Sequence, residues 1–103
     1  MIKQAIIPLA GLGTRLLPLT SVFAKELLPI NGKPGIEYIL DECIEAGIKE
    51  VIFIISKKKL MIKKYFYNDK FYKEIIKRKN DPRIISEYKK ILRYKKMIKF
   101  VFQ

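Results

Sequence analysis

The feature that most constrains the fold is a pair of short apolar runs on either side of a helix-forming segment. Residues 5–10 and 51–55 are apolar and short, which is typical of strands buried on both faces in a parallel sheet. Between them, residues 35–46 carry apolar side chains at helical spacing, and Gly47 follows where a helix is expected to end. This order predicts parallel strands joined by a right-handed crossover.

The rest of the chain continues the alternation of helices and strands. Residues 60–66 and 71–76 have helical spacing, and a third helix is predicted over 83–94, with Pro82 acceptable in its first turn. Residues 98–103 have the pattern of a further strand. We therefore predict the α/β class, with a partial Rossmann-like arrangement of parallel strands and helices on both faces. Residues 31–34 indicate a turn.

The net charge of +12 is concentrated in the second half of the chain. Basic and acidic residues nearly balance up to Ser56, and lysine dominates residues 57–99. A biased codon usage produces such a skew without any binding role, whereas a small basic nucleic-acid-binding protein would use it on phosphates. In that second case, aromatic side chains among the lysines would stack on bases, and the candidates are Tyr65, Phe66, Phe71 and Tyr72.

Cysteine usage and hydropathy bear on the compartment. Cys43 is the only cysteine, so the chain forms no internal disulfide, and with no histidine it lacks a typical zinc site. No apolar run approaches the length that crosses a bilayer, and the N-terminus lacks the pattern of a secretion signal. We expect a cytoplasmic protein with no membrane partner.

A glycine-containing loop follows the first predicted strand. Gly11 and Gly13 let the backbone approach a ligand closely, and successive N–H groups around Thr14 can cradle a phosphate. Arg15 and Lys25 then offer a guanidinium and an ammonium, which together suit a triphosphate. The loop lacks the ending of a Walker motif and the spacing of a dinucleotide fingerprint. By itself it is equally compatible with a tight turn that binds nothing.

Two blocks of sequence resemble a known family. GLGTRLLPLT at residues 11–20 and KELLP at 25–29 resemble the GxGTRxxPxT and PKExLP signature of sugar nucleotidyltransferases. The Ala-Gly-Leu opening at 10–12, the Ala-Gly-Ile at 46–48 and a helical insertion over 65–79 are similar to the bacterial UTP:glucose-1-phosphate uridylyltransferases, or UDP-glucose pyrophosphorylases. Ala24 departs from the uridylyl signature, which has proline before the lysine.

The resemblance implies a role for several side chains. Arg15 and Lys25 would be catalytic, because they would neutralise the triphosphate of UTP. The residues that would bind the nucleotide are Gly11, Gly13, Thr14, Glu26 beside the base or ribose, and Gln103 on the uracil edge. The implied reaction joins UTP and glucose 1-phosphate into UDP-glucose and releases pyrophosphate. Mg²⁺ would bridge the phosphates, with protein ligands beyond this chain.

The resemblance also implies how the chain is organised. Residues 1–103 correspond to the N-terminal, nucleotide-binding portion of a nucleotidyltransferase domain, and the domain is incomplete. We therefore expect the chain alone to be inactive and poorly soluble, and the resemblance implies a homo-oligomer as an expectation for the full-length family. A thymidylyltransferase-type specificity on the same scaffold stays open as an alternative.

Overall fold

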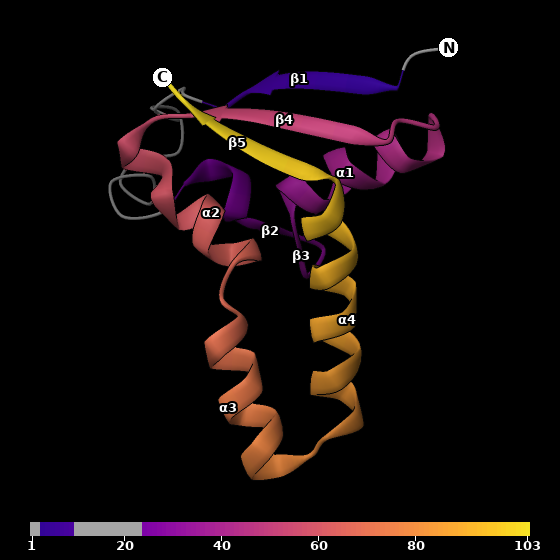
Figure 1. Cartoon of the computed structure of the whole chain (residues 1–103), viewed down its shortest axis with the longest axis vertical. Coiled ribbons are helices and arrows are strands. Elements are labelled where there is room, and N and C mark those ends of the chain that lie inside the picture. The colour runs from indigo at the N-terminus through magenta and orange to yellow at the C-terminus, as the bar shows by residue number, and fades with distance from the viewer. Residues whose placement is uncertain (1–2, 10–23) are drawn as a thin grey trace.

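A three-stranded parallel sheet organises the molecule. The structure is a computed structural model that describes residues 3–9 and 24–103 (Figure 1). The sheet order is β1 (Gln4–Pro8), β4 (Glu50–Ile55) and β5 (Ile98–Phe102), and both pairings are parallel. The predicted parallel strands are confirmed, and Pro8 falls at a strand end, where its missing N–H is tolerated.

The described part of the crossover from β1 to β4, residues 24–49, contains a hairpin and an α-helix. The 3₁₀ turn η3 (Lys25–Leu27) leads into β2 (Pro29–Ile30) and β3 (Lys33–Pro34), which pair antiparallel. Asn31 and Gly32 form the tight turn between them, with φ of 52° and 77°, as two-residue hairpins require. The predicted first helix is confirmed as α1 (Gly35–Glu45).

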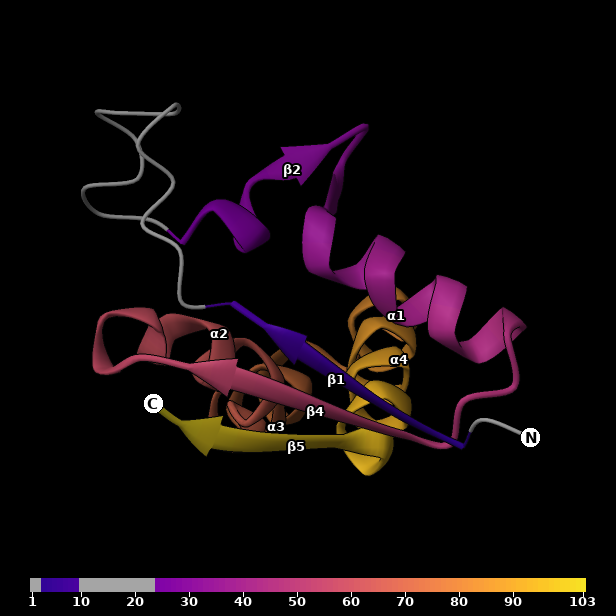
Figure 2. The ribbon, with the colours of Figure 1, turned by 90° about the horizontal axis from the view of Figure 1, so that it is seen from above.

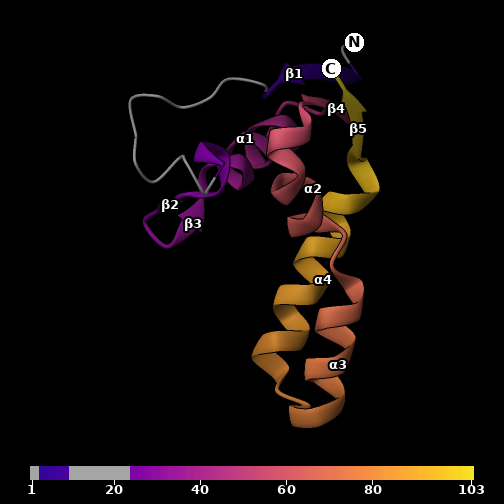
Figure 3. The same cartoon turned by 90° about the vertical axis from the view of Figure 1, so that its left-hand side faces the viewer.

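The segment between β4 and β5 contains a 3₁₀ turn and three helices, of which the last two form an antiparallel arm. The turn η4 (Lys57–Lys59) opens α2 (Leu60–Phe66), and α3 (Asp69–Lys79) and α4 (Pro82–Met97) follow. The α3–α4 pair projects away from the sheet (Figures 1 and 3). Asp81 caps α4 by accepting from the Arg83 backbone N–H, and α4 runs directly into β5.

The hydrophobic core lies on one face of the sheet. Val51, Phe53 and Ile55 of β4 point into it and are fully buried, and they pack against apolar side chains of α1, α2 and α4. On the other face Ile6 is 61 % exposed and Val101 is 49 % exposed. All the described helices lie on the same side of the sheet (Figures 1 and 3).

These positions confirm the α/β class with a parallel sheet, and the described helices occupy one of its two faces. The prediction that the first strand is buried on both faces is wrong for the residues described. In β1 exposed and half-buried side chains alternate, because β1 is an edge strand with one covered face. No helix in the described ranges is long and apolar enough to span a bilayer.

Candidate functional site

The candidate site lies at the carboxyl edge of the parallel sheet. The Leu9 N–H donates to Ile54 O at 2.8 Å and the Gln103 N–H donates to Ile55 O at 2.9 Å. The three strands therefore end side by side, as Figure 2 shows from above, with the C-terminus and η3 at the same end of the sheet. This edge is where open α/β sheets bind their ligands.

The glycine loop falls outside the part of the chain that the structure describes. Gly11, Gly13, Thr14 and Arg15 belong to residues 10–23, which lie between two described segments. The described neighbours, Leu9 before the loop and Ala24 after it, are both buried at this edge. The roles of the four loop residues stay predictions.

Lys25 and Glu26 are adjacent in η3 and have opposite environments. The Lys25 side chain is exposed, whereas Glu26 is 8 % exposed. Glu26 Oε1 accepts a hydrogen bond from Lys59 Nζ at 2.6 Å, and the two side chains form an ion pair with 7 % and 6 % of their surfaces exposed. An ion pair this deeply buried is unusual, because removing both charges from water is costly.

Lys59 is a residue of this edge that the sequence analysis missed. It is the last of three consecutive lysines, and its two neighbours, Lys57 and Lys58, are exposed. A run of identical charged residues normally indicates a solvated surface. Nothing in the sequence of three lysines distinguishes Lys59 from the other two. Its burial follows from the position of η4, which places Lys59 against Glu26.

Gln103 directly follows β5, and its proposed contact with the uracil edge stays a prediction. Its backbone N–H pairs with β4, and its side chain is exposed at the carboxyl edge. Gln103 follows β5, whereas Lys25 lies in η3, within the connection from β1 to β4. Both elements are found at the same end of the sheet. The structure places these described candidates at the same end of the sheet, with Lys25 and Gln103 exposed and Glu26 buried.

A second polar cluster joins α1 to the helical arm. Glu37 of α1 is 1 % exposed, accepts a hydrogen bond from the Tyr65 hydroxyl, and has Lys90 Nζ 3.1 Å from Oε1. Burial and the bond to Glu37 raise the pKa of Tyr65 far above its usual range. Glu37 Oε2 has the Tyr65 hydrogen bond and Oε1 has only the ion pair with Lys90, so these contacts hold a buried carboxylate between three helices, which is a structural task.

Asp41, one turn further along α1, makes a similar connection. It accepts hydrogen bonds from the Lys33 ammonium and, at 2.7 Å, from the Tyr94 hydroxyl. Burial acts to raise the pKa of Asp41, but hydrogen bonds from Lys33 and Tyr94 outweigh it and lower that pKa below its ordinary value. Burial and the bond to Asp41 raise the pKa of Tyr94 above its usual range.

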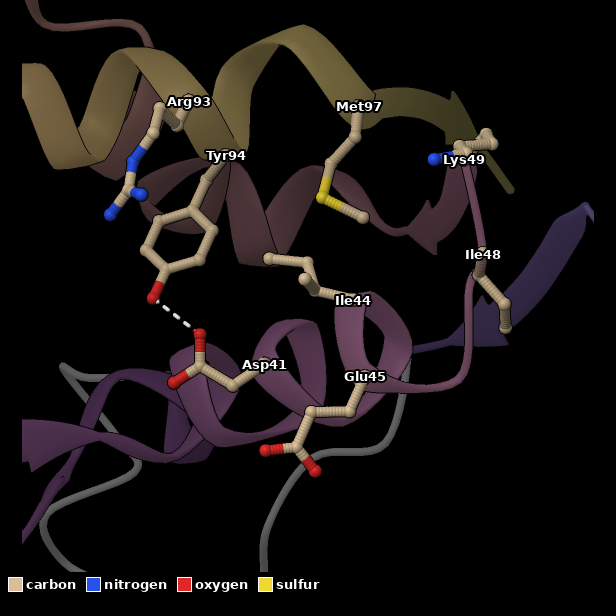
Figure 4. A pocket seen from close by; sticks show the side chains of 8 residues that line it. All are labelled: Asp41, Ile44, Glu45, Ile48, Lys49, Arg93, Tyr94 and Met97. Carbon is tan, nitrogen blue, oxygen red and sulfur yellow. Dashed lines mark hydrogen bonds between the residues drawn. The ribbon is translucent and has the colours of Figure 1, made fainter.

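A pocket of about 580 Å³ lies at the opposite edge of the sheet. Figure 4 shows it between α1 and α4, with Asp41 and Glu45 on one side and Arg93 and Met97 on the other. It opens near the amino ends of β4 and β5, across the sheet from Lys25 and Gln103. It therefore takes no part in the candidate site.

The aromatic side chains proposed for base stacking are mostly engaged within the protein. Phe66 is fully buried, and Tyr72 stacks on Tyr88 with ring centroids 5.0 Å apart. Tyr65 is held by Glu37, so Phe71, at 54 % exposed, is the one of the four candidates that presents most of its surface. A single exposed ring is a poor stacking platform for successive bases.

The described residues do not by themselves fit a metal ion. Within residues 3–9 and 24–103 there is no group of three carboxylate, cysteine or histidine side chains that could hold one. Glu26 is an acidic residue at the carboxyl edge, but its Oε1 already forms an ion pair with Lys59.

Comparison with known proteins identifies the family. The model of the nucleotidyl transferase family matches residues 4–72. The UTP–glucose-1-phosphate uridylyltransferase 1 of Staphylococcus saprophyticus is 44 % identical over 88 residues, which is 85 % of this chain and 31 % of the relative. The Mycoplasma pneumoniae UTP–glucose-1-phosphate uridylyltransferase is 43 % identical over 90 residues, covering 87 % of this chain and 31 % of the relative.

Solved structures show the same similarity over the whole chain. A UTP-bound UGPase from Acinetobacter baumannii superposes with a TM-score of 0.87 and 34 % identity, covering 100 % of this chain and 36 % of that one. A UDP-glucose pyrophosphorylase complexed with UDP-glucose gives a TM-score of 0.69 and 33 % identity, covering 100 % of this chain and 36 % of that one. The chain thus spans about a third of the length of the relatives that it matches.

Proposed function

This chain belongs to the nucleotidyl transferase family, and from that premise we propose that it supplies the nucleotide-binding portion of a UTP:glucose-1-phosphate uridylyltransferase. The observation that supports the proposal is that Lys25 and Gln103 are both exposed at the end of the sheet where the parallel strands finish. The relatives named above supply the substrate class, since their names specify UTP and glucose 1-phosphate.

In the proposed reaction a phosphate oxygen of glucose 1-phosphate attacks the α-phosphorus of UTP. A new phosphorus–oxygen bond forms, the bond from the α-phosphorus to the oxygen bridging the α- and β-phosphates breaks, and pyrophosphate leaves. Such transfers depend on positioning and on charge neutralisation rather than on a protein nucleophile. Arg15 and Lys25 would balance the charge of the triphosphate.

The remaining proposed contacts hold the nucleoside. Gly11, Gly13 and Thr14 would approach the phosphates through the backbone, which glycine allows. Glu26 would border the base or ribose, and Gln103 would hydrogen-bond the uracil edge.

We propose Mg²⁺ as the metal that accompanies the triphosphate, on the resemblance alone. Because the described residues do not form a site for Mg²⁺, we derive no step of the reaction through it. The single buried Cys43 supports a reducing, cytoplasmic compartment.

The test is nucleotide binding by the whole chain, measured by isothermal titration calorimetry with UTP, dTTP and pyrophosphate in turn. We expect UTP to bind more tightly than the other two, and Lys25→Met to weaken UTP binding about tenfold, since a charged contact to phosphate is lost. Lys77→Met, which removes an exposed lysine from α3, is the matched control and should have no effect. Equal loss in both variants would contradict the proposal.

The same titrations address the alternatives. Tighter binding of dTTP than of UTP would indicate the thymidylyl-type specificity instead. A nucleic-acid-binding protein would bind random RNA or DNA with an affinity that falls steeply with salt. We expect weak nucleic-acid binding, because three of the four aromatic candidates are engaged inside the protein.

A further inference from the structure

The buried ion pair between Lys59 and Glu26 joins two elements that follow different strands. Glu26 lies in η3, which follows β1 in the chain order of the described elements, and Lys59 lies in η4, shortly after β4. We propose that Lys59 is a positioning residue, which fixes η3 through Glu26 and so aims Lys25 at the phosphates of the nucleotide. This inference rests on the proposed function, and it assigns Lys59 a role that the sequence motif does not include.

The turn that carries Lys25 needs such support. It spans three residues and is closed by two backbone hydrogen bonds, from Leu27 N to Ala24 O at 3.0 Å and from Leu28 N to Lys25 O at 3.2 Å. A 3₁₀ turn this short does not hold its shape alone, because a few hydrogen bonds do not offset the cost of ordering the backbone. Its conformation therefore depends on contacts with other elements.

Some of those contacts come from α1, whose Gly35 N–H donates to Leu28 O at 3.3 Å, and others come from the segment that follows β4. Besides the ion pair, the backbone N–H of Ala24 lies 2.9 Å from Met61 Sδ in α2. Lys59 of η4 and Met61 of α2 thus both contact the start of η3, through the Glu26 side chain and the Ala24 backbone respectively. Because η4 continues a central strand of the sheet, its position is fixed by the core.

Helical geometry links the direction of Glu26 to that of Lys25. Successive residues in a 3₁₀ helix are rotated by about 120°, so neighbouring side chains cannot point the same way. Glu26 points inward to Lys59, and Lys25 is exposed at the carboxyl edge. Fixing the Glu26 carboxylate therefore fixes the side of η3 from which the Lys25 side chain leaves the backbone.

Stability alone is a poor explanation for this ion pair. Burying two charges costs about as much as their attraction returns, and well-packed apolar residues often replace such pairs without loss of stability. The two side chains also lie beside the proposed catalytic lysine, at the edge where ligands bind. A positioning role explains both the burial and the location.

A double-mutant cycle on UTP affinity tests the inference. The four proteins are the unchanged chain, Lys25→Met, Lys59→Met and the double variant, each titrated with UTP and corrected for its folded fraction. If Lys59 acts through Lys25, Lys59→Met should weaken binding about tenfold in the unchanged chain and less than about twofold when Lys25 is already methionine. Additive losses would overturn the proposal, because they would show that the two lysines act independently.

A second variant covers the case in which Lys59→Met leaves Glu26 buried without a partner and the chain unfolds. Glu26→Met with Lys59→Met replaces the ion pair by two apolar side chains of similar length, and we expect this protein to fold. Its UTP affinity should also be about tenfold lower than that of the unchanged chain, and, because Glu26 is itself a proposed nucleotide contact, this loss should shrink to less than about twofold when Lys25 is already methionine. A folded double variant with full affinity would overturn the proposal.

Amide hydrogen exchange without nucleotide separates this inference from the proposed function. We expect the Leu27 and Leu28 amides to exchange at least about tenfold faster in the Glu26→Met, Lys59→Met protein, while the amides of β4 keep their protection. If the unchanged chain binds no UTP, the proposed function fails, and this measurement alone decides the role of Lys59. Unchanged protection at Leu27 and Leu28 would overturn it.

Discussion

The hydroxyl of Tyr65 in α2 donates a hydrogen bond to Oε2 of Glu37 in α1, a carboxylate that is 1 % exposed. Lys90 of α4 approaches the other carboxylate oxygen, so one buried charge joins three helices. The arm formed by α3 and α4 is therefore attached to the crossover helix by a polar contact as well as by the apolar core. This attachment sets the position of α2, whose Met61 contacts the segment before η3.

Tyr65→Phe should destabilise the fold by about 1–3 kcal/mol, because it leaves a buried carboxylate oxygen without its donor. Chemical denaturation followed by circular dichroism measures the change in the free energy of unfolding. Tyr67→Phe is the matched control, since the Tyr67 side chain is 41 % exposed, and we expect less than about 0.5 kcal/mol there. Equal effects of the two substitutions would show that the Glu37 contact contributes nothing.

The stability of the fold should fall in alkaline solution. Burial, followed by hydrogen bonds to Glu37 and Asp41, raises the pKa of both Tyr65 and Tyr94 above the usual value near 10. The folded chain therefore holds the two hydroxyl protons more tightly than the unfolded chain does. The contribution of these two tyrosines to the free energy of unfolding is fully present below pH 10. The stabilisation is lost as the pH rises above 10.

Thermal unfolding between pH 8 and 11 measures this effect. The melting temperature of the unchanged chain should be nearly constant to about pH 10 and decrease above it. In the variant with both Tyr65→Phe and Tyr94→Phe the decrease should be shallower, starting from a lower melting temperature. A decrease of the same steepness in both proteins would show that other groups cause the alkaline loss.

The face of the sheet opposite the helices should make the chain self-associate. Ile6 and Val101 are exposed there, and the half-buried Ile52 and Ile54 lie between them in the register. An apolar sheet face with an open edge strand favours association. We expect Ile6→Lys to lower the apparent molecular mass in light scattering and to reduce the binding of a hydrophobic dye.

Phe71→Lys is the control for that experiment. It also replaces an exposed apolar residue by lysine, but on α3, far from the sheet face. We expect it to leave the apparent molecular mass unchanged. If both substitutions reduce association equally, the added charge is responsible, and the sheet face is not the associating surface.

Much of the fold follows from the sequence because its local signals are strong. Gly47 adopts a φ of 80° after α1, Pro82 opens α4, and the apolar stripes on the helices face the core. These features depend on residues close in sequence, so periodicity and turn chemistry are sufficient to predict them.

The features that the sequence did not predict depend on tertiary position. The residues of β1 are as apolar as those of a central strand, but β1 lies at an edge with one covered face. Lys59 is indistinguishable in the sequence from its neighbours, yet η4 places it against Glu26. The sequence motif suggested roles for Arg15 and Lys25. It does not show how Lys25 is oriented, because that depends on the tertiary contact between its neighbour Glu26 and Lys59.

The measurement that tests the account most directly is a nuclear magnetic resonance titration of the isotope-labelled chain with UTP, followed at every backbone amide. The account predicts that the largest shifts occur at the carboxyl edge, at Leu9, Lys25, Glu26, Lys59 and Gln103. Shifts concentrated instead around Asp41, Glu45 and Arg93, in the pocket at the opposite edge, would contradict the proposed nucleotide site.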